Sequence, residues 1–322
     1  MKTFGRYLSY RLRQSWIRTL IFAVLSISLS QSVIRNELES SFPESGLYIL
    51  AIILGIFCTV IPMLELGEYK NRRNLDALYS FAISRKKLAL LHYLSGWIQV
   101  TVIYTATYLF ACLTLVTHDS PFQLIYLLPY YFLSLCVGLI MYSFFLFFFG
   151  EANSETDGVL FCVLGIFWFS AIVGLGEELL FGAVRFSRLW VWVYDPLDYL
   201  TSLFEYWIHS PETISWGAET ALEEWYMFIP WGAIGIACSV GYFFTFSRKP
   251  AEKNGDISNS WFGYRTMIPI YGFFLASISL KWIFVTILML AGYFIYRRSF
   301  KLKKSDLIVL GVAMLAAMIF GI

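Results

Sequence analysis

Nine apolar stretches, divided by short segments that hold most of the charged residues, restrict what this chain can fold into. Six longer stretches come first and three shorter ones follow, at roughly residues 17–34, 47–64, 88–116, 122–149, 158–175, 225–246, 267–280, 282–296 and 307–322. A transmembrane helix needs about 20 predominantly apolar residues, and helices satisfy their own backbone hydrogen bonds in lipid. The pattern therefore predicts an all-α, polytopic integral membrane protein.

The composition agrees with this prediction. Hydrophobic residues make up 58% and charged residues 14% of the 322 residues, whereas globular domains hold about 45–50% apolar and about 25% charged residues. A net charge of +2 argues against a nucleic-acid-binding protein. The five cysteines fall inside apolar runs without metal-ligand spacing, and the three histidines lie in separate segments. No metal site is therefore predicted.

The two ends of the chain differ from the central stretches. Residues 1–16 carry four basic residues and, at helical spacing, the apolar residues Phe4, Tyr7, Leu8, Leu12 and Trp16. This pattern predicts an amphipathic interfacial helix that leads into the first span. At the other end, the short stretches within 267–296 are compatible with two spans or with one re-entrant hairpin divided by Lys281.

The distribution of basic residues predicts the orientation. With the N-terminus in the cytoplasm, only Arg35, Arg185, Arg188 and Lys281 lie outside, and the other 20 of the 24 Lys and Arg residues lie inside. Such an excess is typical of the cytoplasmic side of a multi-pass protein of the cell (plasma) membrane. The inner loop 150–157, which is acidic, departs from this pattern.

Two loops are larger than simple connections need. The outer loop 176–224 holds nine acidic residues and four Trp, and we expect interfacial or re-entrant helices there. The inner loop 65–87 contains Asp76 four residues after Arg72, with apolar residues three and four apart, which predicts a short amphipathic helix. Ser84 offers an N-cap oxygen to the next span.

Two segments of the sequence resemble a known family of membrane proteins. Residues 68–73 combine an acidic residue, a Tyr and basic residues, and residues 82–85 read Ala-Ile-Ser-Arg where the third span opens. This is similar to the inner coupling region of ABC-2 type permeases and their Pro-Ile-Ser-Arg box, with Ala82 in place of the Pro. Residues 246–256 resemble the exit from the sixth span of Ytr-type permeases of Gram-positive bacteria.

The resemblance implies an architecture and a set of partners. After the helix at 1–16 it implies an ABC-2 type transmembrane domain over 17–246 with a six-span, exporter-type core. A C-terminal extension of two to three membrane helices follows at 247–322. A separate ABC ATP-binding subunit is expected on the cytoplasmic face, and a second permease, identical or different, is expected alongside. The residues implied in coupling to the ATP-binding subunit are Glu68, Lys70, Arg72, Arg73, Asp76, Ser84 and Arg85.

The expected function is that of a transport subunit and not an enzyme. The sequence has no GxxxxGK[ST] phosphate-binding loop, so no cofactor is expected and ATP would be bound by the partner. The resemblance, together with aromatic and aliphatic spans, favours export of an amphipathic or cell-envelope-related compound.

Two other classes of protein are weighed against this interpretation. An ion-coupled secondary transporter usually carries ionisable residues within its spans, whereas here the apolar stretches, apart from Lys281, lack charged residues in their middles. An intramembrane protease of the CPBP type is suggested by Glu177 and Glu178, which resemble its paired glutamates. Gly182 stands at the position of that motif's Arg, and only His209 follows, on the outer loop.

Overall fold

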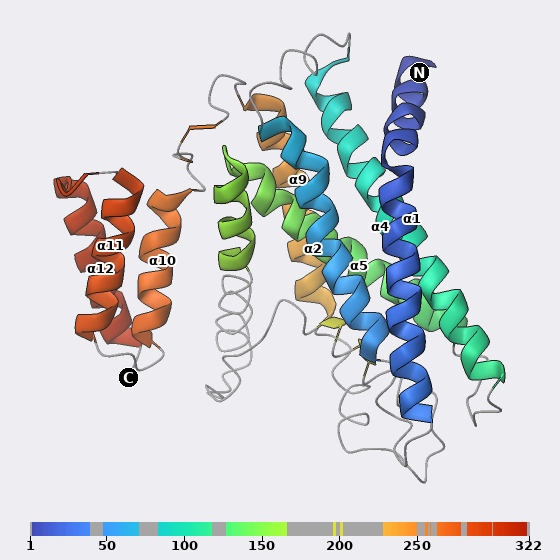
Figure 1. The fold of residues 1–322 in the computed structure, drawn as a ribbon. Coiled ribbons are helices and arrows are strands. Elements are labelled where there is room, and N and C mark those ends of the chain that lie inside the picture. The colour runs from blue at the N-terminus through green and yellow to red at the C-terminus, as the bar shows by residue number, and fades with distance from the viewer. Residues whose placement is uncertain are drawn as a thin grey trace.

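The structure is a computed structural model, and it consists of helices joined by connecting segments. It describes residues 2–38, 48–70, 83–117, 127–165, 196–197, 200–201, 228–249, 255–256, 258, 263–277, 282–297 and 299–320, and no strand occurs among them. Residues 155–165 are also helical. The helices labelled in Figure 1 are α1 (Lys2–Leu38), α2 (Tyr48–Lys70), α4 (Arg85–Thr117), α5 (Leu127–Glu151), α9 (Phe228–Arg248), α10 (Tyr264–Ser277), α11 (Trp282–Arg297) and α12 (Lys304–Phe320).

Four of these helices, α1, α2, α4 and α5, are long and apolar enough to cross a membrane. Their outward faces are apolar as well: Val24 and Leu25 of α1 and Leu109 and Leu113 of α4 are 57–61% exposed. Apolar side chains exposed in this number along helices need lipid or another protein around them. The prediction of an all-helical, membrane-embedded chain therefore agrees with the structure.

The helices form two groups that lie side by side in Figure 1. Helix α1 packs along α4, α2 packs against α4 and α5, and α5 packs along α9. Helices α10, α11 and α12 pack on one another. Helices α10 and α11 have 14 and 16 residues, or about 21 and 24 Å at 1.5 Å per residue. Both are shorter than the hydrocarbon core, which is about 30 Å thick.

Two helix boundaries differ from the prediction. The interfacial helix predicted at 1–16 and the span predicted from 17 belong to one continuous helix, α1. Helix α2 runs through Lys70, so the inner loop predicted to begin at residue 65 begins later. The reason is that Glu65 and Glu68, which sequence reasoning treats as the start of a solvated loop, are paired with arginines of α1. Paired carboxylates do not need water around them, and the helix continues.

The core of the larger group is aromatic. The run Phe144–Phe149 lies near the C-terminal end of α5, and every side chain of this run is buried against neighbouring helices. Tyr104 of α4 and Tyr130 and Tyr142 of α5 are also almost completely buried. These rings fill the space between α2, α4, α5 and α9, so the aromatic run of α5 is packing surface.

The Tyr142 side chain of α5 packs against α4 at Gly96. The Tyr142 hydroxyl of α5 reaches over this glycine and donates a hydrogen bond to the Tyr93 carbonyl oxygen, 3.2 Å away. A Cβ atom at position 96 would collide with that hydroxyl and lie 3.2 Å from Cγ of Glu65 on α2. Three helices therefore meet where residue 96 has no side chain.

We predict that Gly96→Ala destabilises the helix bundle. The added methyl group has to displace Tyr142, and overpacking of this kind costs about 1–3 kcal/mol. Gly232→Ala is the matched control, because a Cβ atom there meets nothing within 4 Å, and alanine in a helix is favoured over glycine by about 1 kcal/mol. Thermal unfolding in detergent should show a lower Tm for Gly96→Ala than for Gly232→Ala. Equal Tm values would contradict the prediction.

Candidate functional site

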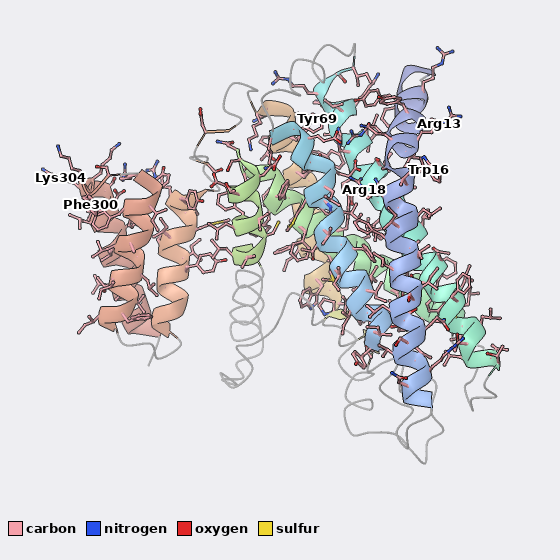
Figure 2. The ribbon with its side chains drawn as sticks, in the orientation of Figure 1. Arg13, Trp16, Arg18, Tyr69, Phe300 and Lys304 are labelled. Atoms are coloured by element: carbon pink, nitrogen blue, oxygen red, sulfur yellow. The ribbon has the colours of Figure 1, made fainter. Side chains whose placement is uncertain are left out.

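A cluster of charged and polar side chains joins α1, α2 and α4. It lies at the end of the molecule where α1 begins, α2 ends and α4 begins, which we call the N-terminal end. Tyr69 and Arg18 mark this region in Figure 2. The members of this polar cluster are Arg11 and Arg18 of α1, Glu65, Glu68 and Tyr69 of α2, and His92 and Gln99 of α4.

Glu65 lies at the centre of the polar cluster. Its side chain is 1% exposed. Arg18 Nη2 lies 2.7 Å from Oε1 and Arg11 Nη2 lies 3.3 Å from Oε2. Gln99 Nε2 donates a third bond to Oε1 at 2.8 Å. A buried carboxylate is tolerated only with paired charges and hydrogen bonds, and these three side chains supply them.

Glu68 connects the polar cluster to the surface. Arg11 Nη1 donates to Glu68 Oε2, so the same guanidinium contacts both carboxylates of α2. The Glu68 side chain is 37% exposed, whereas that of Arg11 is 6% exposed. Two arginines balance two glutamates in this arrangement. A contact made to Glu68 from outside therefore acts on Arg11 and, through it, on the buried Glu65.

His92 adds a second connection between α2 and α4. Its Nε2 atom shares a hydrogen bond of 2.5 Å with the Tyr69 hydroxyl, and its Nδ1 atom lies 3.7 Å from Glu65 Oε2. The Tyr69 ring also packs edge-on against Phe246 of α9, with centroids 5.6 Å apart.

Among the described residues, no group of three or more His, Cys, Asp or Glu side chains is placed to hold a metal ion.

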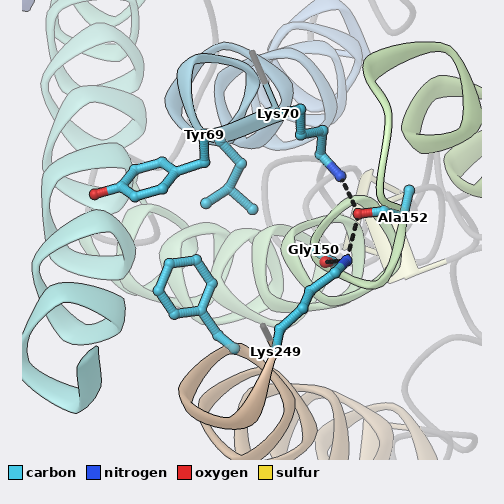
Figure 3. A pocket seen from close by; sticks show the side chains of 7 residues that line it. Tyr69, Lys70, Gly150, Ala152 and Lys249 are labelled. Atoms are coloured by element: carbon cyan, nitrogen blue, oxygen red, sulfur yellow. Dashed lines mark hydrogen bonds between the residues drawn. The ribbon is translucent and has the colours of Figure 1, made fainter. Parts of the chain in front are cut away.

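Two lysines bind the end of α5 close to the polar cluster. The last carbonyl groups of a helix lack intrahelical partners and carry partial negative charge, which lysines near the C-terminus satisfy. The bonds seen in Figure 3 belong to this set: Lys70 Nζ donates to the carbonyl oxygens of Phe149 and Ala152, and Lys249 Nζ donates to those of Gly150, Glu151 and Ala152. We call this arrangement the lysine cap.

The lysine cap ties three parts of the chain together. Lys70 ends α2, Lys249 follows α9, and both hold α5. Burial lowers the pKa of Lys249 to about 8, although Glu151 and Asp157 nearby act in the opposite direction. A cavity of about 30 Å³ lies between Tyr69, Phe246 and the two lysines (Figure 3). That is room for about one water molecule.

The acidic loop predicted at 150–157 is shorter in the structure, because α5 runs through Glu151 and residues 155–165 are helical. Asp157, in this second helix, is held by hydrogen bonds. Asp157 Oδ1 accepts a bond from the Tyr264 hydroxyl, and its Oδ2 accepts bonds from the Ser258 hydroxyl and backbone N–H. Ser258 Oγ in turn accepts from the Asn153 N–H. These bonds attach Tyr264 at the start of α10, and Ser258 before it, to the helix at 155–165, which accounts for the acidic Asp157 at a predominantly basic end.

The structure places four of the seven predicted coupling residues at the N-terminal end. Glu68 joins the polar cluster, and Lys70 is buried in the lysine cap. Ser84 directly precedes α4, at the position predicted for the N-cap residue, and its backbone carbonyl oxygen accepts from the Leu88 N–H. Arg85 is exposed and donates to the Lys249 carbonyl oxygen. Arg72, Arg73 and Asp76 lie outside the described residues.

Sequence reasoning did not find the other members of the polar cluster. Arg11 and Arg18 were assigned only to the basic flank of the first span. A usable signal exists in the spacing: Arg11 and Arg18 are seven apart, as are His92 and Gln99, and Glu65 and Glu68 are three apart. These separations put each pair on one face of its helix.

Comparison with known proteins assigns no family. No family model matches the chain, and no curated protein matches it.

We predict that Glu65→Gln destabilises the protein far more than Glu68→Gln does. Removing the Glu65 charge leaves the buried Arg11 with Glu68 alone and takes from Arg18, which is 28% exposed, its carboxylate partner. Loss of one partner of a buried ion pair costs about 3 kcal/mol or more. Glu68 is partly exposed, and its loss costs less because Arg11 remains paired with Glu65. Denaturant unfolding of both variants in detergent checks the difference. Similar small losses in both would show that Glu65 is not the centre of the cluster.

Proposed function

We propose that this chain is the membrane subunit of an ATP-driven transporter of the ABC-2 type. The observation that supports this most directly is the position of Glu68. It is one of the residues implied in coupling, and it is half-exposed at the N-terminal end while bonded to the buried Arg11. A separate ATP-binding subunit would dock at this end, and its movement would reach the polar cluster through Glu68.

The proposal requires that energy enters from a partner. The sequence has no phosphate-binding loop of its own. A partner shifts a conformational equilibrium only by its differential affinity for the two states. The polar cluster supports such a difference, because displacement of Glu68 changes what Arg11 donates to, and Arg11 holds α1 against α2. Helix α1 and the end of α2 would then move relative to each other.

The remaining features of the proposal follow from the resemblance and the charge distribution. The protein would lie in the plasma membrane, with its N-terminal end facing the cytoplasm. Six spans would form the core, and α10 to α12 would form the C-terminal extension. A second permease would complete the transport path, and the cargo would be an amphipathic or cell-envelope-related compound.

One observation favours a second candidate, an ion-coupled secondary transporter. Glu65 and His92 are ionisable, lie within apolar helices and are almost completely buried, and such residues often belong to ion or proton pathways. Pairing of Glu65 with two arginines argues for a structural role instead. Uptake or efflux driven by a proton gradient in vesicles that hold this chain alone would favour the second candidate. The glutamates considered for a protease, Glu177 and Glu178, lie outside the described residues.

We predict that Arg72→Glu combined with Arg73→Glu uncouples ATP hydrolysis from transport. Reversing both charges in the inner loop should prevent this loop from docking in the correct position on the ATP-binding subunit, because charges at an interface mainly determine specificity and alignment. The measurement is substrate-stimulated ATPase activity of the complex in proteoliposomes. Arg72→Lys with Arg73→Lys keeps the charge and should retain stimulation. Normal stimulation in the Glu variant would count against the proposal.

We also predict that Glu68→Gln lowers the amount of cargo moved per ATP while the complex still assembles. The neutral side chain keeps its size but no longer attracts Arg11, so force applied at position 68 reaches Glu65 less effectively. Arg13→Gln is the control, because Arg13 is exposed on α1 and outside the polar cluster. Copurification with the ATP-binding subunit and the transport-to-ATPase ratio are measured together. Equal ratios in both variants would remove Glu68 from the coupling route.

A further inference from the structure

The turn between α11 and α12 presents an unusual surface. The Phe300 side chain is 89% exposed, more than any other large hydrophobic side chain that the structure describes. Lys301, Lys303 and Lys304 beside it are also exposed. None of these three ammonium groups has an ion-pair partner within the described part of the chain. An aromatic ring and three free cations therefore point outward from one short turn.

The turn is held in this shape by Asp306. Arg297 at the end of α11 donates two hydrogen bonds to this carboxylate, at 2.6 and 2.7 Å, and the Lys303 N–H donates a third at 3.1 Å. The Lys301 N–H is bonded to Ser299 Oγ. Because Arg297 is used to close the turn, the three lysines and Phe300 are left as its outer surface. The Phe300 ring contacts that of Phe294, with centroids 5.3 Å apart.

The turn lies at the end of two helices with exposed apolar faces. Ile295 of α11 and Ile308 of α12 lie within about two turns of it and are 74% and 66% exposed. Further along, Ile287 and Val312 continue these apolar faces. The turn also lies at the same end of the molecule as Arg13, as the labels of Phe300, Lys304 and Arg13 in Figure 2 show. Two exposed apolar helix faces thus end directly at three exposed lysines.

We propose that the α11–α12 turn is a binding surface for anionic phospholipid headgroups. Lysines next to an apolar helix face extend toward lipid phosphates, and a basic segment beside membrane helices attracts anionic lipids. Phe300 inserts among the upper acyl carbons, as aromatic rings do at the membrane interface. The partner is a lipid and not a soluble protein, because the charged surface continues without a break into the apolar faces of α11 and α12. This inference does not depend on the transport function.

The test uses the full chain with 4-fluorophenylalanine at position 300, reconstituted in nanodiscs of phosphatidylcholine with a minor fraction of phosphatidylglycerol. A nitroxide is placed high on the acyl chain of either lipid, and broadening of the fluorine signal is measured. The phosphatidylglycerol label should broaden the signal more than the phosphatidylcholine label. Neutralising a single lysine should reduce that preference by up to about fivefold, since a lysine near an anionic surface contributes about 1 kcal/mol.

Three triple variants separate a local site from general attraction. Lys301→Gln, Lys303→Gln and Lys304→Gln together should abolish the preference, and the three corresponding Lys→Arg changes should keep it. The control neutralises three exposed basic residues elsewhere at the same end, Arg13→Gln, Lys86→Gln and Lys87→Gln, and should leave the preference intact.

Five results would overturn the proposal. They are equal broadening by both labelled lipids, loss of the preference in the control variant, broadening of the fluorine signal by a water-soluble gadolinium chelate but by neither lipid, protection of the signal from every reagent, and a preference that persists in the triple Lys→Gln variant. The third would place the turn in water, and the fourth would show that protein covers it.

Discussion

The buried carboxylate of Glu65 is the constraint on which the N-terminal end of this protein depends. A carboxylate with 1% exposure inside an apolar bundle is stable only when its charge is balanced and its oxygens accept hydrogen bonds. Arg11, Arg18 and Gln99 provide both. Because the arginines belong to α1 and the glutamine to α4, satisfying one side chain fixes the relative register of three helices. Rotating α1 by one residue would move both guanidinium groups away from α2.

A similar requirement fixes the other side of α2. The last carbonyl groups of α5 need donors, and Lys70 and Lys249 supply them from α2 and from the segment after α9. The cost of burying two ammonium groups is offset by the number of carbonyl oxygens they reach, since each lysine donates to more than one. The hydrophobic effect that packs the rings of α5 is non-directional. The hydrogen bonds of the two lysines are directional, so they fix how the ends of α2, α5 and α9 are aligned along the helix axes.

The apolar stretches predict where the described helices lie, because the hydropathy of a stretch is the sum over its own residues and can be read from a short window of sequence. Helix ends are less predictable, as α2 shows. A charged residue marks the end of a span only if its side chain faces water, and the Glu65 side chain is buried. Of the candidate site, Glu68 was found through a resemblance, whereas Arg11 and Arg18 were not. Their contacts join residues far apart in the sequence, and they depend on how the helices cross, which local patterns do not specify.

The last two turns of α2 are where the two polar arrangements meet. Glu65 and Glu68 belong to the polar cluster, Lys70 belongs to the lysine cap, and Tyr69 lies between them against His92 and Phe246. Hydrogen bonds join this short segment to α1, α4 and α5, and the Tyr69 ring packs against Phe246 of α9. A displacement of the segment would therefore break charged hydrogen bonds on at least one side, so its neighbours either follow it or exchange partners. Under the proposed function, a force applied to the chain that continues at residue 71 would act on four helices at once, without passing through the apolar middle of the membrane.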